Sequence, residues 1–128
     1  MEKICLDFEI ALDFLRGDPA TIEKLKNYAY REEICITSIT LMHLLESVNK
    51  PDVVQAFAAS VTVLPFDKKA AQFANKIALD LREKGSGRMT DSMLTAAICM
   101  ANDAFLYYKA SDRTTVTKYE GIRGLRKV

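Results

Sequence analysis

Two short apolar runs of the chain are each followed or preceded by an aspartate. Residues 4–6 lead into Asp7, and Asp91 opens an apolar helical stretch over residues 92–101. A carboxylate at the end of a buried strand and another at the start of a helix can meet at one edge of a sheet. Converging carboxylates repel each other unless a cation lies between them, and such hard oxygen ligands suit Mg²⁺ or Mn²⁺. The two aspartates therefore predict a divalent-cation site.

Two polar side chains of one predicted helix, His43 and Glu46, are further candidates for this site. At 100° per residue they lie about 60° apart, and about 150° from the centre of the apolar stripe on the same helix. Both therefore leave the helix on its polar side, where a cleft or solvent must lie; for the histidine, a plain surface position is the alternative. The stripe is predicted to consist of Leu41, Leu44, Leu45 and Val48.

Glu9 and Asp112 are additional oxygen donors near the expected site. Each carboxylate also has a purely structural interpretation. Asp7 would serve as a helix cap, and Glu9 would be an exposed helix residue. Asp91 would be a carboxylate in the first turn of its helix, where the helix dipole stabilises negative charge. The occurrence of Asp7 and Asp91 at two positions that border the same predicted crevice favours the functional interpretation.

Other chemistries lack their usual patterns in this sequence. The run of residues 85–87 is rich in glycine but lacks the lysine and the spacing of a phosphate-binding loop. No serine lies in a nucleophile elbow. Thiol catalysis would require one of the cysteines, which all lie in apolar segments, to pair with the single histidine of the sequence. Metal-assisted hydrolysis of a phosphodiester is the chemistry that the carboxylates favour, because a bound divalent cation lowers the pKa of its water.

Strands alternating with helices must position these residues. The pattern predicts strands at residues 3–6, 33–36, 61–64 and 104–108, with helices between them. Such alternation predicts parallel pairing and a three-layer α/β/α sandwich, and the almost wholly apolar strands fit burial on both faces. The working crevice of such a fold lies at the carboxyl ends of the strands. The predicted helices cover residues 10–15, a second segment from Pro19, 40–48, 53–59, about 68–84 and 91–102.

Length and composition fit one domain spanning residues 1–128, with 49% hydrophobic and 27% charged residues. No apolar run approaches the ~20 residues of a membrane span, and no signal peptide is recognisable. Three cysteines sit singly in apolar segments, which predicts buried thiols in a cytoplasmic protein. The last 20 residues hold six basic and two acidic side chains, which could steer a phosphate backbone or form a solvated terminus.

Taken in order along the chain, several segments resemble a PIN domain, and the likeness is greatest to the small VapC-type toxins of prokaryotic toxin–antitoxin pairs. The resemblance implies a mainly parallel α/β/α sandwich and Mg²⁺- or Mn²⁺-dependent cleavage of RNA. It also implies a small antitoxin partner that covers the site, and a homodimer. The matching segments are residues 6–7, 12–17, 34–41, 63–67 and 91–98.

The resemblance carries over unevenly to the acidic positions. Asp7 and Asp91 match two of the four that are usual in the family. His43 stands where the family has a glutamate, and Ala110 falls where an asparagine or aspartate is expected, with Asp112 two residues later. A neutral imidazole suits Mn²⁺ better than Mg²⁺ and brings no negative charge.

Glu9 replaces the small polar residue that usually follows the first acid by two positions. We expect that Glu9 or Glu46 restores the charge lost at His43. Three functions follow from these observations: a metal-dependent ribonuclease with a modified site, an inactive PIN fold that binds RNA or protein, and a receiver-like phosphorelay domain. The last would rely on Asp67 and Lys109, and its strand order fits poorly.

Overall fold

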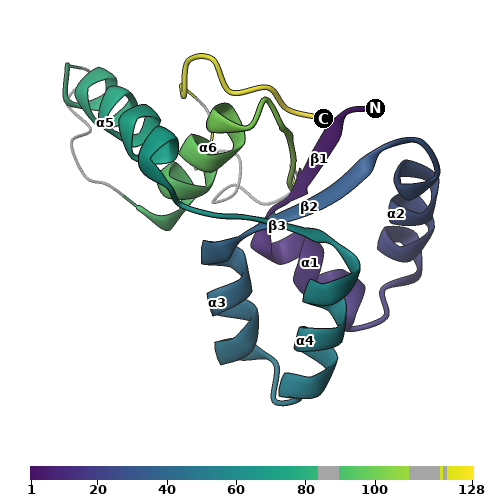
Figure 1. Cartoon of the computed structure of the whole chain (residues 1–128). Coiled ribbons are helices and arrows are strands. Elements are labelled where there is room, and N and C mark those ends of the chain that lie inside the picture. The colour runs from purple at the N-terminus through teal and green to yellow at the C-terminus, as the bar shows by residue number, and fades with distance from the viewer. Residues whose placement is uncertain (84–89, 110–118, 120) are drawn as a thin grey trace.

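The computed structural model describes residues 1–83, 90–109, 119 and 121–128 (Figure 1). Helices and strands alternate over most of this length, as the sequence predicts. The elements are β1 (Lys3–Leu6), α1 (Phe8–Leu15), α2 (Pro19–Arg31), β2 (Glu33–Thr37), α3 (Ser38–Ser47), α4 (Pro51–Ser60), β3 (Thr62–Leu64), α5 (Lys68–Glu83), α6 (Asp91–Ala101) and β4 (Phe105–Tyr107).

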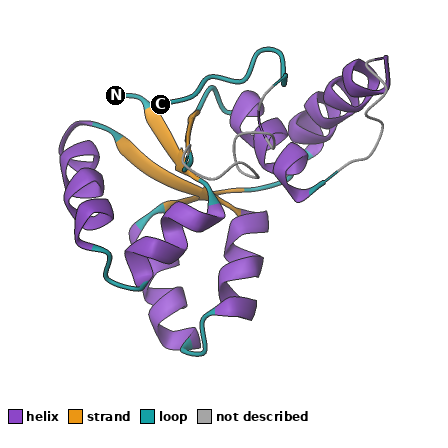
Figure 2. Cartoon of the chain, turned by 180° about the vertical axis from the view of Figure 1, so that it is seen from behind, coloured by secondary structure: helices purple, strands orange, loops and turns teal. Residues whose placement is uncertain are grey.

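The strands form one parallel sheet in the order β3-β2-β1-β4 within the described residues. Parallel order brings the carboxyl ends of β1 and β2 to one edge, and in register Cys5 lies opposite Cys35 while Leu6 lies opposite Tyr107. Helices cover both faces of the sheet (Figure 2). The fold is therefore the predicted three-layer α/β/α sandwich.

Alternate strand residues fill two separate parts of the core. Cys5 and Cys35 pack with α5 and α6 on one face, whereas Leu6 and Ile36 pack with α1 to α4 on the other. All three cysteines are free and buried, as expected. Burial raises the pKa of the Cys35 thiol to about 12, and a hydrogen bond with the Cys99 thiol raises that of Cys5.

Side-chain caps fix the starts of the helices that border the carboxyl edge. Thr37 accepts a hydrogen bond from the Thr40 amide at 3.0 Å to begin α3, and Thr90 accepts one from Met93 at 3.4 Å to begin α6. Such caps satisfy amide groups that have no partner inside the helix. Both caps therefore set where His43 and Asp91 leave their helices.

The buried stripe predicted for α3 is wrong in one position, because Leu45 is exposed. The helix begins at Ser38 rather than at residue 40, and Thr40 and Leu44 form its buried centre. Because α3 packs against α1, α4 and α6, its buried face is centred on Thr40 and Leu44 rather than on the predicted stripe. His43 is therefore half-buried at the margin of the core, whereas Glu46 is exposed.

The final residues run beside β4. The Leu106 amide donates to the Arg126 carbonyl, and the Val128 amide donates to the Leu106 carbonyl, each at 2.9 Å. A single parallel bridge pairs Leu106 with Lys127, so the end of the chain adds a bridge to the sheet. Among the helices that the structure describes, none has the length and apolar character of a membrane span.

Candidate functional site

A cavity of about 400 Å³ lies at the carboxyl edge of the sheet, between the end of β1 and the helices α3 and α6. We call it the acid cavity. Asp7, His43 and Asp91 all line it, although the two aspartates are 84 positions apart in the sequence. The structure thus brings together three of the six predicted site residues. The described lining is Asp7, Phe8, Ile39, Thr40, His43, Ser47, Thr90, Asp91, Ser92, Thr95 and Tyr119.

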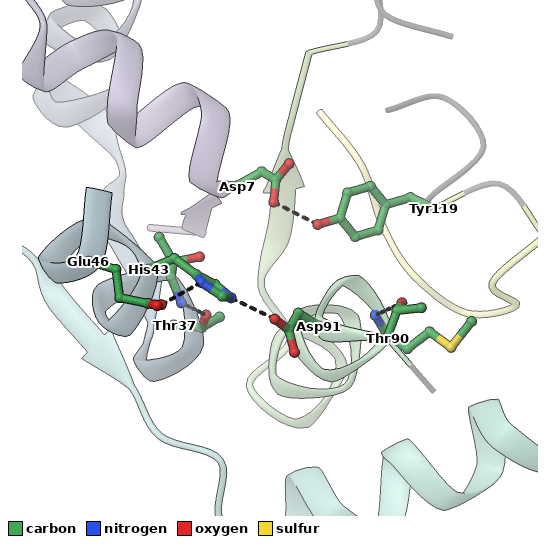
Figure 3. A network of polar contacts seen from close by, with 9 residues as sticks. Asp7, Thr37, His43, Glu46, Thr90, Asp91 and Tyr119 are labelled. Carbon is green, nitrogen blue, oxygen red and sulfur yellow. Dashed lines mark hydrogen bonds and ion pairs between the residues drawn. The ribbon is translucent and has the colours of Figure 1, made fainter. Parts of the chain in front are cut away.

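Asp7 is buried at the end of β1, with 5% of its surface exposed. It occupies the N-cap position of α1, yet its side chain makes no capping hydrogen bond with that helix. Its backbone amide donates to the Tyr107 carbonyl of β4 at 2.9 Å. The carboxylate instead accepts a hydrogen bond from the Tyr119 hydroxyl, Oδ1 lying 2.7 Å from the phenolic oxygen (Figure 3). Asp7 thus holds the predicted N-cap position, but its carboxylate accepts a hydrogen bond from Tyr119 rather than from the helix.

Tyr119 was not predicted as a site residue. It is buried, and its ring packs against that of Tyr108 with centroids 5.2 Å apart. Burial raises the pKa of Tyr119 well above its ordinary value, and the negative charge of Asp7 adds to this effect. Its hydroxyl therefore remains a proton donor to the carboxylate. The one signal in the sequence is a bulky aromatic residue between the charged residues Lys118 and Glu120.

Asp91 belongs to a different environment on the opposite wall of the acid cavity. Its Oδ2 lies 2.6 Å from Nε2 of His43, and Nδ1 of that ring lies 3.1 Å from Oε1 of Glu46 (Figure 3). The ring also meets Phe8 edge-on, with centroids 5.9 Å apart. A neutral imidazole donates to one of the two carboxylates, and an imidazolium donates to both. Asp91, His43 and Glu46 thus form a polar chain that leads from the cavity to solvent.

The remaining predicted site residues lie elsewhere. Glu46 contacts His43 but is exposed, and Glu9 is half-buried and is not among the described residues that line the acid cavity. Asp112 and Ala110 fall outside the described residues. Nearby, Lys109 pairs with Asp13 at 2.5 Å. That pairing raises the pKa of Lys109, with smaller contributions from the negative charges of Glu9 and Asp18.

The donor set of the acid cavity can be compared with the needs of a divalent cation. Within the part of the chain that the structure describes, no group of three or more His, Cys, Asp or Glu side chains is placed to hold a metal ion. The cavity does offer two carboxylates and one imidazole. Mg²⁺ commonly keeps several waters and takes only one or two protein carboxylates. The residues therefore fit a largely hydrated cation rather than one enclosed by protein ligands.

One curated relative and many solved structures are similar to this chain, whereas no protein-family model matches it. The relative is a tRNA(fMet)-specific endonuclease VapC from Shigella flexneri. It is 28% identical over an alignment of 92 residues, and the match covers 66% of this chain and 69% of the relative.

Several solved structures match nearly the full length of this chain. VapBC from Salmonella typhimurium, bound to DNA, is 25% identical with a TM-score of 0.81, and the match covers 100% of this chain and 98% of that one. VapBC2 from Rickettsia felis, bound to a promoter DNA fragment, is 19% identical with a TM-score of 0.81, covering 98% and 97%. The latter shows the fold alone. This chain is therefore similar in sequence to a VapC endonuclease and similar in fold to VapBC structures.

Proposed function

We propose that this single-domain protein is a metal-dependent endoribonuclease of the VapC toxin type, with a modified acidic site. The observation that carries the proposal is the convergence of Asp7 and Asp91 on one cavity at the carboxyl edge of a parallel sheet. Two carboxylates facing a shared cavity are costly without a cation, so their convergence needs a reason. The similarity to a curated VapC endonuclease supplies the reaction class.

Asp7 and Asp91 would hold Mg²⁺ or Mn²⁺ in this proposal, with His43, Glu9, Glu46 or Asp112 completing its surroundings. A bound divalent cation supplies an activated water and offsets negative charge on the phosphodiester. Tyr119 fixes one oxygen of Asp7 by its hydrogen bond, so that this carboxylate keeps a single orientation. His43 lies against Asp91 and would either share the cation or give up its contact when the cation binds.

An imidazole at this position has a consequence for metal choice. His43 offers a nitrogen donor where a carboxylate would offer oxygen and negative charge. Nitrogen donors favour Mn²⁺ over Mg²⁺. We therefore expect RNA cleavage to be faster in Mn²⁺ than in Mg²⁺. In the variant His43→Glu, the cleavage rates in the two metals should differ less.

We further propose an antitoxin partner, an RNA substrate and a homodimer for this protein, acting in the cytoplasm. The solved structures named above are VapBC complexes, which supports a protein partner. The exposed side chains of Arg123, Arg126 and Lys127 near the chain end offer positive charge for an RNA backbone.

The test is cleavage of a labelled RNA in Mn²⁺ by the wild type and by Asp7→Asn. We expect the variant to lose at least about 100-fold in rate, since the loss of one metal-binding carboxylate removes most of the charge stabilisation. Asp52→Asn, which alters an exposed carboxylate in the first turn of α4, is the matched control and should cleave normally. Equal, background-level products from wild type and Asp7→Asn would refute the enzyme proposal.

A second candidate function is an inactive PIN fold that binds RNA or protein. The contact between Asp91 and His43 favours this function, because the Asp91 oxygen that would bind a cation already contacts the imidazole ring. The same experiment separates the two functions. An inactive module would bind the labelled RNA or an antitoxin but would leave the RNA intact with either metal.

A further inference from the structure

A second and larger cavity lies at the opposite edge of the sheet from the acid cavity. It has a volume of about 910 Å³ and lies where β1 and β4 begin, against the second half of α2. We call it the amino-edge groove and define it by Lys24, Tyr28, Arg31, Phe105 and Lys127, which all line it. Its volume is within the range of ligand-binding clefts, about 300–1,000 Å³. None of the residues that line the acid cavity lines it.

Positive charge dominates the described lining of this groove. Lys24, Lys26, Arg31 and Lys127 contribute four basic side chains against the two carboxylates of Glu2 and Glu32. One of those carboxylates is already engaged, because the Glu2 amide donates to Glu32 at 2.7 Å. The excess of cations over carboxylates indicates an anionic ligand.

Aromatic rings are interleaved with these cations. Tyr30 is 91% exposed, and the half-buried Tyr28 and Phe105 also line the groove. The Arg126 guanidinium lies 4.4 Å from the centre of the Phe105 ring, and the Lys24 ammonium lies 4.7 Å from that of Tyr107. Aromatic rings and guanidinium planes beside a cationic track are the surfaces on which single-stranded bases stack.

We propose that the amino-edge groove binds single-stranded RNA at a distance from the acid cavity. The choice of RNA as the ligand rests on the proposed ribonuclease function; the anionic and aromatic character of the ligand rests on the groove alone. The four residues of β1 separate the two edges of the sheet by about 13 Å. The groove would therefore hold nucleotides that flank the cleaved bond and would contribute to affinity rather than to chemistry.

The test is the fluorescence anisotropy of a fluorescein-labelled octauridine in EDTA. Without a divalent cation the acid cavity repels phosphates, so binding reports on other surfaces. We expect Tyr30→Ala to weaken binding about fivefold or more, through loss of one stacked base. The double variant Arg31→Ala with Lys127→Ala should weaken binding at least tenfold and reduce the slope of log K against log salt by about 1.4.

A matched control is Lys69→Ala, which removes an exposed lysine from α5, away from the groove, and should bind as the wild type does. The substituted groove residues are exposed, so circular dichroism should show unchanged folding. Wild-type affinity in all groove variants overturns the proposal. The proposal is also overturned if a polyglutamate peptide displaces the labelled RNA at the same concentration as unlabelled octauridine does. The groove would then be a general site for anions or peptides.

Failure of this proposal and failure of the proposed function give different results. If the wild type cleaves RNA and the groove variants bind octauridine normally, the groove proposal alone is wrong. If no protein cleaves RNA but the groove variants lose binding, the ribonuclease proposal is wrong and the RNA-binding groove stands.

Discussion

The two aspartates of the acid cavity are held in opposite ways. Asp7 is buried at the end of a central strand and accepts a hydrogen bond from a buried tyrosine. Asp91 has 59% of its side chain exposed and contacts the half-buried ring of His43, which in turn contacts an exposed glutamate. One carboxylate belongs to the core of the fold, and the other belongs to a surface chain of polar groups.

This difference separates a fixed wall of the cavity from an adjustable one. The position of Asp7 follows from the parallel sheet, because its own amide is tied to β4 and its side chain to Tyr119. Asp91 itself is placed by α6, but the orientation of its side chain depends on its contact with the half-buried His43 ring, and contacts between partly exposed side chains contribute little to stability and rearrange at little cost. A site with one fixed carboxylate and one movable carboxylate can admit a cation without disturbing the core.

The largest expected effect tests the fixed wall. Replacing Tyr119 by phenylalanine keeps the ring but removes the donor to a buried carboxylate oxygen. We expect a loss of about 1–3 kcal/mol in the free energy of unfolding, the usual cost of leaving a buried polar group unsatisfied. Urea denaturation followed by circular dichroism, without divalent cations, measures this loss.

The exposed tyrosine Tyr30 provides the matched control. Tyr30→Phe removes the same hydroxyl from the surface and should change the free energy of unfolding by less than about 0.5 kcal/mol. If Tyr119→Phe costs no more than Tyr30→Phe, Asp7 is not held by the tyrosine and the contrast between the two walls disappears.

The sequence predicted the fixed wall in part. The apolar run before Asp7 and the alternation of strands and helices were enough to predict the sheet, the parallel pairing of its strands and the edge where Asp7 lies. Local patterns suffice there because a strand buried on both faces is apolar throughout. Tyr119 escaped prediction because its part in the site rests on a hydrogen bond to Asp7, 112 positions away in the sequence, which no local pattern encodes.

The adjustable wall was predicted less well. Helix periodicity correctly indicated that His43 and Glu46 leave α3 on one side, but it assigned Leu45 to the buried stripe, and this is wrong. Only the packing of α3 against its neighbours decides how far the helix is rotated, and that packing brings His43 to the cavity margin. The proximity of His43 to Asp91 likewise depends on two helices meeting, so the residue types alone could not indicate it.

A smaller effect should appear in alkaline solution. The pKa of Tyr119 is raised in the folded protein by burial and by Asp7, while the unfolded chain titrates near pH 10. Stability from this group is therefore complete below about pH 10 and is lost as the pH rises further, because only the unfolded state releases the proton. At pH 11 the loss should be about 1.4 kcal/mol relative to neutral pH.

Tyr119→Phe lacks this contribution, whereas the buried thiols titrate equally in both proteins. The difference in unfolding free energy between the wild type and the variant should therefore shrink from pH 8 to pH 11, measured by urea denaturation in the presence of a reductant. A difference that stays constant over this range would mean that the phenol is not shielded from ionisation, and Asp7 would then lie in a more hydrated environment than the fixed wall requires.

The smallest effect concerns the adjustable wall. Glu46 contacts His43 at 3.1 Å, so it can fix the orientation and proton position of that ring, whereas Glu9 is not among the described residues of the cavity lining. We expect Glu46→Gln to weaken Mn²⁺ binding about fivefold in calorimetry, below the tenfold or more typical of partners of metal ligands. The effect is reduced because 67% of the Glu46 side chain is exposed, and the substitution should leave the free energy of unfolding unchanged.

The matched control is Glu9→Gln, which should leave the affinity for Mn²⁺ unchanged. If Glu9→Gln proves to be the variant that weakens Mn²⁺ binding, charge at the site is restored from α1 beside Asp7, and the polar chain through His43 has no part in holding the cation.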